Sequence, residues 1–119
     1  EVRVCKGIKR MLNAGVNPNR ITISSDGQGS LPMYSSDGEF LGMGVGQSSC
    51  LLKEVKECVF KADIPLEIAL STITSNPAEI LRLNGKGKIE EGYDADLCIL
   101  DQELQLVEVI AKGNTVYTK

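Results

Sequence analysis

Histidine and tryptophan are absent from the 119 residues, and aromatic residues make up only 4%. Water-activating metal sites and most proton-transfer sites depend on imidazole, because it combines a near-neutral pKa with a nitrogen ligand. The sequence therefore does not supply a complete site of either kind. The four cysteines are widely spaced, with no Cys-x-x-Cys pair. Buried free thiols in a reducing cytosol are favoured over a disulfide framework or a zinc cluster.

Long hydrophobic runs and an excess of positive charge are also lacking. No apolar run approaches the roughly 20 residues needed to span a bilayer, and the amino terminus shows no basic stretch followed by an apolar one. The net charge of -3 argues against nucleic acid as a partner, because phosphate binding needs an excess of Lys and Arg. The hydrophobic content of 42% is ordinary for one globular domain. We expect a soluble, cytoplasmic chain that binds neither nucleic acid nor membranes.

The first part of the chain predicts a helix, a loop and a strand. Apolar residues recur at helical spacing over residues 4–12, and Gly15 is placed to end that helix as a C-cap. A β-branched strand is predicted over residues 20–25. Residues 31–47 are glycine-rich and are expected to be irregular, with a turn at residues 35–38.

Helices and then short strands are predicted for the rest. Helices are expected from Ser48 or Ser49 to about Ala62, from Pro65 to Ile73, and after Asn76. In the last of these, Asn76 is expected to be the N-cap, with Pro77 at the first helical position and Glu79 reaching back as in a capping box. Strands over residues 96–100, 106–111 and 115–117 then predict a small β unit. Asp94 and Asp96 lie beside Gly92 and are interpreted as turn residues rather than catalytic carboxylates.

Asp26 is the first candidate for a functional residue. It follows the β-branched run directly and precedes Gly27, so a carboxylate lies where a strand is predicted to end. In parallel α/β folds, ligands gather at the carboxyl ends of strands. Asp-Gly is also a common turn pair, and these few residues alone favour a turn over a functional site.

Three motifs together resemble one enzyme family. The sequence Ser-Ser-Asp-Gly-Gln-Gly-Ser at residues 24–30, followed by Leu31 and Pro32, is similar to the end of the eighth barrel strand in isoaspartyl dipeptidases of the amidohydrolase superfamily. Residues 74–78 and 87–97 are similar to closing signatures of that superfamily, in the same order. The resemblance covers nearly the whole chain.

The resemblance implies an α/β fold: the carboxyl-terminal part of a (β/α)8 metal-dependent hydrolase barrel, plus part of a small β domain. Residues 1–84 would provide the last helix and strand of the barrel with the helices that follow. Residues 85–119 would provide the carboxyl-terminal segment of the β domain. We expect a homo-oligomer, and we expect these 119 residues to be inactive as an isolated chain.

The chemistry implied by the resemblance is hydrolysis of β-aspartyl dipeptides by a hydroxide that bridges two zinc ions. Those ions would be held by four His, a carboxylated Lys and one Asp, and only the Asp has a counterpart here, which is Asp26. Asp26 would be both a metal ligand and the catalytic proton acceptor. Ser30 matches a residue that binds substrate through its hydroxyl group, although loop turning explains it equally well.

Two alternatives stay open. The signatures at residues 74–78 and 87–97 are shared widely in the superfamily, so a dihydroorotase-like or deacetylase-like enzyme also fits. A binding or assembly module without catalysis is the second alternative. Which dipeptides would be preferred, and which metal is native, does not follow from the residues.

Overall fold

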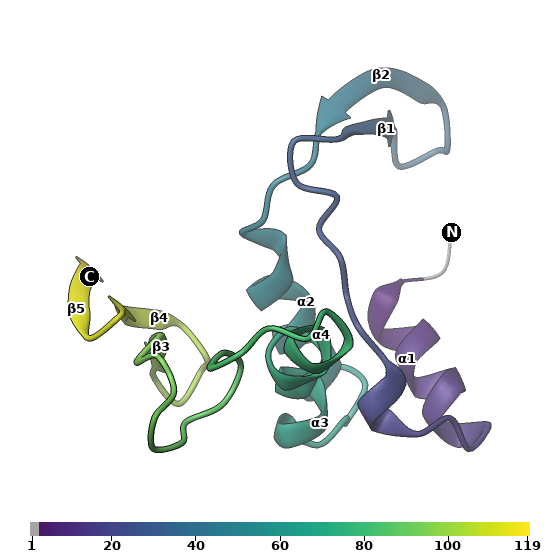
Figure 1. The fold of residues 1–119 in the computed structure, drawn as a ribbon. Helices are drawn as coiled ribbons and strands as arrows, with labels where there is room; N and C mark the ends of the chain where they lie inside the picture. The colour runs from purple at the N-terminus through teal and green to yellow at the C-terminus, as the bar shows by residue number, and fades with distance from the viewer. Residues whose placement is uncertain (1–2) are drawn as a thin grey trace.

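A computed structural model describes residues 3–119. The elements in chain order are α1 (Val4–Asn13), the 3₁₀ helix η1 (Pro18–Arg20), β1 (Ser30–Tyr34), β2 (Phe40–Val45), α2 (Cys50–Phe60), α3 (Leu66–Ser71), α4 (Ser75–Ile80), β3 (Leu97–Leu100), β4 (Leu106–Ala111) and β5 (Asn114–Thr118). Three bodies are visible: a group of helices, a hairpin that projects away from it, and a small sheet to one side (Figure 1). Within residues 3–119, no helix combines the length and the apolar content needed to cross a membrane.

The helix α1 ends as the sequence predicts. Gly15 has a φ of 88°, a left-handed conformation that glycine adopts without steric cost. The Gly15 N–H donates to the Leu12 carbonyl at 3.1 Å, and the Val16 N–H donates to the Met11 carbonyl at 3.0 Å. These two bonds form a Schellman motif, which confirms Gly15 as the residue that ends the helix.

The strand predicted over residues 20–25 is not formed as a strand. Arg20 belongs to η1, and residues 21–25 are extended but have no ladder partner among residues 3–119. A strand needs hydrogen-bonded neighbouring strands. The Ile23 N–H donates instead to the Thr72 carbonyl, which follows α3, at 3.1 Å. The segment is nonetheless part of the core, because Ile21 is buried.

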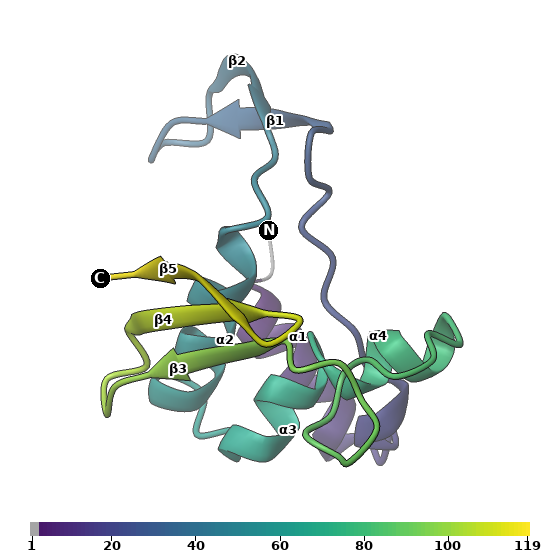
Figure 2. The same cartoon turned by 60° about the vertical axis from the view of Figure 1, so that its left-hand side comes forward.

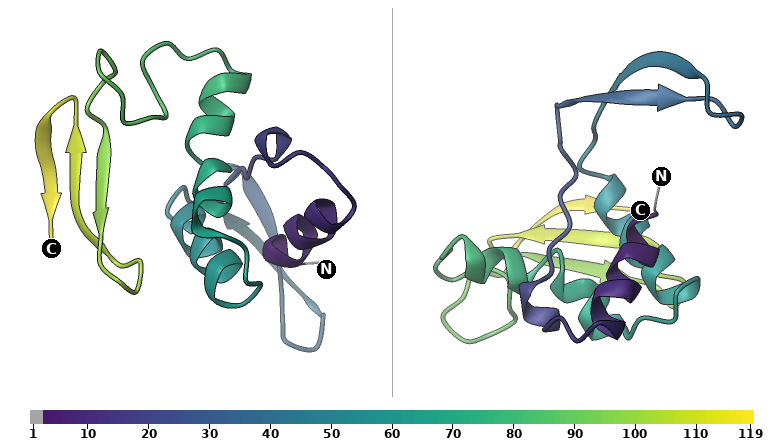
Figure 3. Two further views of the ribbon diagram at one scale, coloured as in Figure 1. Left: turned by 90° about the horizontal axis from the view of Figure 1, so that it is seen from below. Right: turned by 90° about the vertical axis from the view of Figure 1, so that its right-hand side faces the viewer.

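The prediction that residues 31–47 are irregular is wrong. They contain the antiparallel hairpin of β1 and β2. Gly42 and Gly44 pair with Met33 and Leu31. The Met33 side chain lies against Gly44, where a Cβ would come within 2.9 Å of its sulfur. The predicted turn at residues 35–38 is confirmed, with the Gly38 N–H donating to the Ser35 carbonyl at 3.0 Å. Figure 2 and the right-hand view of Figure 3 show the hairpin standing clear of the helices.

The helices after the hairpin begin close to the predicted residues, but the local account of α4 was wrong. Its N-cap is Thr74, so Asn76 lies inside the first turn and Pro77 one residue further along. Within the described residues, neither Asn76 nor Glu79 makes a capping hydrogen bond. The Asn76 side chain is instead buried, and it bonds to a distant part of the chain.

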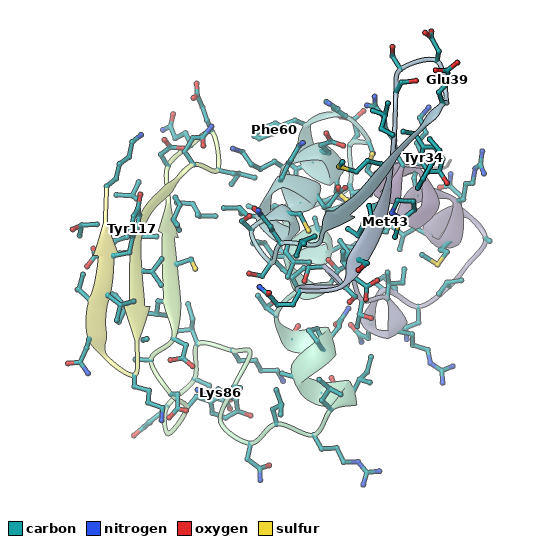
Figure 4. All side chains as sticks on the ribbon, turned by 90° about the horizontal axis from the view of Figure 1, so that it is seen from above. Tyr34, Glu39, Met43, Phe60, Lys86 and Tyr117 are labelled. Carbon is teal, nitrogen blue, oxygen red and sulfur yellow. The ribbon has the colours of Figure 1, made fainter. Side chains whose placement is uncertain are left out.

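The small sheet has the predicted strands in the order β3-β4-β5, all antiparallel. Asp94 and Asp96 both accept from the Lys86 Nζ, and the second oxygen of Asp96 accepts from the Lys112 N–H at 2.8 Å. These bonds tie the loop after α4 to the β4-β5 turn, which supports the structural interpretation of both carboxylates. Figure 4 shows Lys86 in that loop, beside the sheet that carries Tyr117.

The apolar core lies among α1, α2, α3 and the extended segment. Its buried members are Cys5, Ile8, Ile21, Val55, Cys58, Ile64 and Ala69. The hairpin contributes none of them, and the small sheet is half-buried at most apart from the adjoining Leu104. The core therefore fixes the amino-terminal end of the extended segment, whose other end leads to Asp26.

Candidate functional site

Asp26 lies at the point where the extended segment turns into the hairpin. Its backbone has a φ of 52°, a left-handed conformation that is uncommon for a residue with a Cβ. The Gly29 N–H donates to the Asp26 carbonyl at 2.7 Å, and Gln28 between them has a φ of 68°. Asp adopts this region more readily than most residues, and it is also adopted by Asp63, Arg82, Leu104 and Lys112, so it defines the turn without marking a site. The Asp26 side chain is exposed.

The base of the hairpin holds this turn in place. The Gln28 N–H donates to the Gly46 carbonyl at 2.9 Å, and the Gly46 N–H donates to the Gly29 carbonyl at 2.8 Å. A Cβ at Gly46 would lie 2.5 Å from the Asp26 carbonyl oxygen. Only glycine permits this close approach, so Gly46 helps to set the backbone position of Asp26.

Ser30 is the first residue of β1 and pairs with Val45 at the same base of the hairpin. Its side chain is exposed. The turn and the hairpin therefore place both predicted site residues on one short stretch of chain, Asp26 in the turn and Ser30 where the ladder begins.

A buried amide at the other end of the extended segment was missed as a long-range contact. The Asn76 Nδ2 donates to the carbonyls of Pro18 and Ile21, both at 2.8 Å, and the side chain is only 2% exposed. These carbonyls lie where η1 becomes the extended segment, which runs from there to Asp26. The Asn-Pro pair was visible in the sequence, but it indicated a helix cap, and no local pattern reveals a bond across 55 residues.

The described residues do not form a metal site among themselves. Within residues 3–119 no group of three or more His, Cys, Asp or Glu side chains is arranged to hold an ion. Zinc sites need three or four protein ligands. Asp26 offers one exposed carboxylate with a fixed backbone, so it fits a single ligand position and the described residues do not complete the site.

The groups whose pKa values are shifted by the structure lie away from Asp26. Hydrogen bonds from the Lys86 ammonium and the Lys112 N–H lower the pKa of Asp96, and hydrogen bonds to Asp94 and Asp96 raise the pKa of Lys86. Burial raises the pKa of the Cys58 thiol to about 11, with smaller contributions from Cys5 and nearby glutamates. The Lys86–Asp96 pair stabilises a loop, and Cys58 is a thiol in the core, so neither shift indicates a catalytic group.

Comparison with known proteins relates this arrangement to one family. The family model described as "Amidohydrolase family" matches residues 3–118. The β-aspartyl dipeptidase of Fervidobacterium islandicum AW-1, solved in complex with a β-Asp-Leu dipeptide, superimposes with a TM-score of 0.81 and 36% sequence identity. That match covers 97% of this chain and 29% of the dipeptidase.

Curated relatives have several activities. A dihydroorotase of Endomicrobium trichonymphae is 39% identical over 59 residues, which is 50% of this chain and 14% of the relative. An N-acetylglucosamine-6-phosphate deacetylase of Lysinibacillus sphaericus is 30% identical over 82 residues, which is 67% of this chain and 20% of the relative. The chain thus spans less than a third of each of these proteins. With a family match over residues 3–118, the chain belongs to the amidohydrolase family, and its structure is like that of an isoaspartyl dipeptidase.

Proposed function

We propose that this chain contributes Asp26 and Ser30 to the active site of a metal-dependent hydrolase that cleaves β-aspartyl dipeptides. The observation that carries this proposal is the 36% identity to a β-aspartyl dipeptidase over 97% of the chain. The backbone bonds between the turn and Gly46 support it, because they hold the backbone of Asp26 in one position at the base of the hairpin.

The proposal includes the placement of the chain within such an enzyme. Residues 1–84 would be the last helix and strand of a (β/α)8 barrel with the following helices, and residues 85–119 would be part of a small β domain. The extended segment at 21–25 supports this, because it has a strand conformation with both edges free of ladder partners among residues 3–119. Residues 1 and 2 of the first unit lie outside the described residues.

Asp26 would act as the proton carrier. A carboxylate at the end of a barrel strand can accept a proton from the water that attacks the amide carbonyl, and then pass it to the leaving amine. The exposed side chain on a fixed turn suits this task, because the carboxylate can reach a substrate while its backbone stays in position.

The same carboxylate would be a metal ligand. A bound zinc ion would polarise the scissile carbonyl and lower the pKa of water. Since Asp26 is the one ligand that the described residues offer, the other ligands would come from elsewhere in the complete enzyme.

Ser30 would bind the substrate. Its hydroxyl group can donate to a carboxylate of a dipeptide. Ser30 is held at the start of β1 by pairing with Val45, four residues after Asp26. We expect Ser30→Ala to raise KM for the dipeptide more than it lowers kcat, because the hydroxyl group takes no part in proton transfer.

Hydrolysis of a cyclic amide is the second candidate function. The observation in its favour is the 39% identity to a dihydroorotase, although it covers only half of this chain. Asp26 would have the same proton-transfer task in either reaction, so the role of the residue does not distinguish the two substrates.

Turnover by the complete enzyme that carries this chain distinguishes them. We expect hydrolysis of β-Asp-Leu and no turnover of dihydroorotate at equal substrate concentration. Preferred turnover of dihydroorotate would overturn the dipeptidase proposal. Turnover of neither substrate by a folded, zinc-loaded enzyme would contradict both candidates and leave a deacetylase-like enzyme or a non-catalytic module.

A further inference from the structure

A hollow lined by positive charge lies between α1 and the end of α2, away from Asp26. Its volume is about 340 Å³. The residues around it are Arg3, Cys5, Lys6, Lys9, Arg10, Asn13, Lys61 and Ala62. Cys5 is buried and Ala62 is half-buried, so these two form a neutral floor beneath a cationic rim. Among residues 3–119, no acidic side chain lines the hollow.

The cations of α1 form one stripe. Arg3, the N-cap of α1, is followed by Lys6 and Arg10 at spacings of three and four residues, which places the three cations along one side of the helix. Within residues 3–119, these three and Lys9 form no ion pair. Lys61, which follows the end of α2, pairs with the half-buried Glu57 at 3.2 Å.

This concentration of charge does not follow from the composition. The chain has a net charge of -3, with 13 Lys and Arg against 16 Asp and Glu. Five of those cations nevertheless surround one hollow. Like charges at these spacings on a helix repel one another, so a bound anion would relieve a repulsion that the described residues leave uncompensated.

We propose that this hollow binds a small anion that carries several phosphate charges, such as an inorganic oligophosphate or a nucleotide polyphosphate. The volume lies at the lower end of the range for small-molecule sites. The stripe from Arg3 to Arg10 rises about 10 Å along the helix, which is the length of a short phosphate chain. Guanidinium groups bind phosphate oxygens in pairs and ammonium groups act as point charges, so the rim offers both kinds of contact.

Calorimetric titration of the complete enzyme that carries this chain, with inorganic triphosphate, tests the proposal. We expect one binding event per chain, weakened as sodium chloride is raised, because salt screens exposed charges. The double variant Lys6→Gln/Arg10→Gln should bind at least about tenfold more weakly, since it removes two charge-assisted contacts and Gln preserves helix propensity. Lys61→Gln should also weaken binding, because the hollow has two walls.

A matched double variant separates a site from a general effect of charge. Arg82→Gln/Lys88→Gln removes the same two charges from exposed positions outside the hollow. We expect it to bind triphosphate as the unmodified chain does. Equal loss in both double variants, an unchanged affinity in Lys61→Gln, or no binding of triphosphate would overturn the proposal.

Binding of a thymidine oligonucleotide more tightly than triphosphate would overturn it in favour of a nucleic-acid surface. Comparison of ATP with triphosphate shows whether the nucleoside adds affinity to the shared phosphate chemistry.

Discussion

Single residues decide the geometry at Asp26 through the backbone. Asp26 itself takes a left-handed conformation, and Gly46 lies so close that a Cβ there would come within 2.5 Å of the Asp26 carbonyl oxygen. The carboxylate is thereby carried on a fixed turn while its own side chain is exposed. The backbone therefore sets the position of Asp26, and the exposed carboxylate stays free to react.

The chemistry of Asp26 is tested by Asp26→Asn in the complete enzyme. Asn retains the size of the side chain and tolerates the left-handed region, so the fold should be kept. The amide cannot accept a proton, and we expect turnover of β-Asp-Leu to fall by roughly 10² to 10⁴. Asp37→Asn, an identical change at an exposed position in the hairpin turn, is the control and should leave turnover unchanged. A variant of Asp26 that keeps more than about a third of the activity would show that it is not the proton acceptor.

The core thiol of Cys58 makes stability depend on alkaline pH. Burial raises its pKa to about 11, so the folded chain holds the thiol proton more tightly than the unfolded chain does. The resulting stabilisation is present below the unfolded pKa of about 9 and is lost as the pH rises towards about 11, and it amounts to something on the order of 2 kcal/mol.

Chemical denaturation at several pH values measures this contribution. We expect the stability difference between the unmodified chain and Cys58→Ala to shrink across the range from about pH 9 to about pH 11. Cys98→Ala is the control, because Cys98 is an exposed thiol. A difference for Cys58→Ala that is constant with pH would contradict the assignment.

Elements in this chain depend on one another through few contacts. The extended segment at 21–25 is held by the core at Ile21, by the Ile23 bond to α3 and by the Asn76 bonds from α4. Beyond it, the Gly46 bonds join the turn to the hairpin. The position of Asp26 thus depends on helices that are distant in sequence.

Asn76→Ala should loosen the segment that leads to Asp26. The substitution leaves the Pro18 and Ile21 carbonyls without the amide donor, and an unsatisfied buried polar group costs about 1–3 kcal/mol. We expect the unfolding free energy to fall by that amount and the Ile23 amide to exchange faster with solvent. Asn84→Ala, at an exposed position, is the control. Unchanged exchange at Ile23 in the Asn76 variant would show that the amide does not hold the segment.

Gly7 inside α1 and Gly15 just beyond its end should respond to alanine in opposite directions. Gly7 lies inside the helix, and among the described residues nothing lies within 4 Å of a Cβ built there. Gly7→Ala should therefore stabilise the chain by about 0.5–1 kcal/mol. Gly15→Ala should destabilise it by roughly 1 kcal/mol or more, because φ is 88° and alanine is strained there. Equilibrium urea denaturation compares the two, and a shift in the same direction for both would contradict this account of the helix.

At the scale of the whole molecule, much apolar surface is uncovered. The hairpin exposes Tyr34 at 55%, Phe40 at 61% and Met43 at 58%, with Tyr34 and Phe40 in edge-to-face contact at its tip. Figure 4 shows Tyr34 and Met43 along this hairpin, Glu39 at its far end, and Phe60 on α2. Such surfaces in a water-soluble chain mark places where other protein packs, or where chains associate.

We expect the isolated 119-residue chain to self-associate at micromolar concentration. Light scattering should give a mass above the 12.8 kDa of one chain. The double variant Leu41→Lys/Met43→Lys, which charges the exposed face of β2, should lower that mass. A variant with Lys at exposed Thr115 and Thr118 of β5 adds the same charge to a polar surface and is the control. A monodisperse monomer with a sharp thermal transition would show a self-sufficient domain and would contradict the placement within a larger barrel.

The sequence by itself determined the features that depend on residues close together in the chain. The helix over residues 4–13 follows from apolar spacing and Gly15, and the three strands of the small sheet follow from β-branched runs between turn residues. Asp26 and Ser30 were found by their motif, and their catalytic and substrate-binding roles stay predictions. The hairpin is also local, but its glycines concealed it, because they remove the alternating pattern by which a strand is recognised.

The tertiary structure alone decided what depends on distant partners. The segment at 21–25 has the composition of a strand, but a ladder needs neighbouring strands, and none pairs with it among residues 3–119. Asn76 has the local sequence of a helix cap. Its amide instead bonds to the Pro18 and Ile21 carbonyls, because a buried polar group needs a hydrogen-bond partner. The basic hollow likewise arises only when α1 packs against α2, since a count of charges along the chain records their number and not their distances in space.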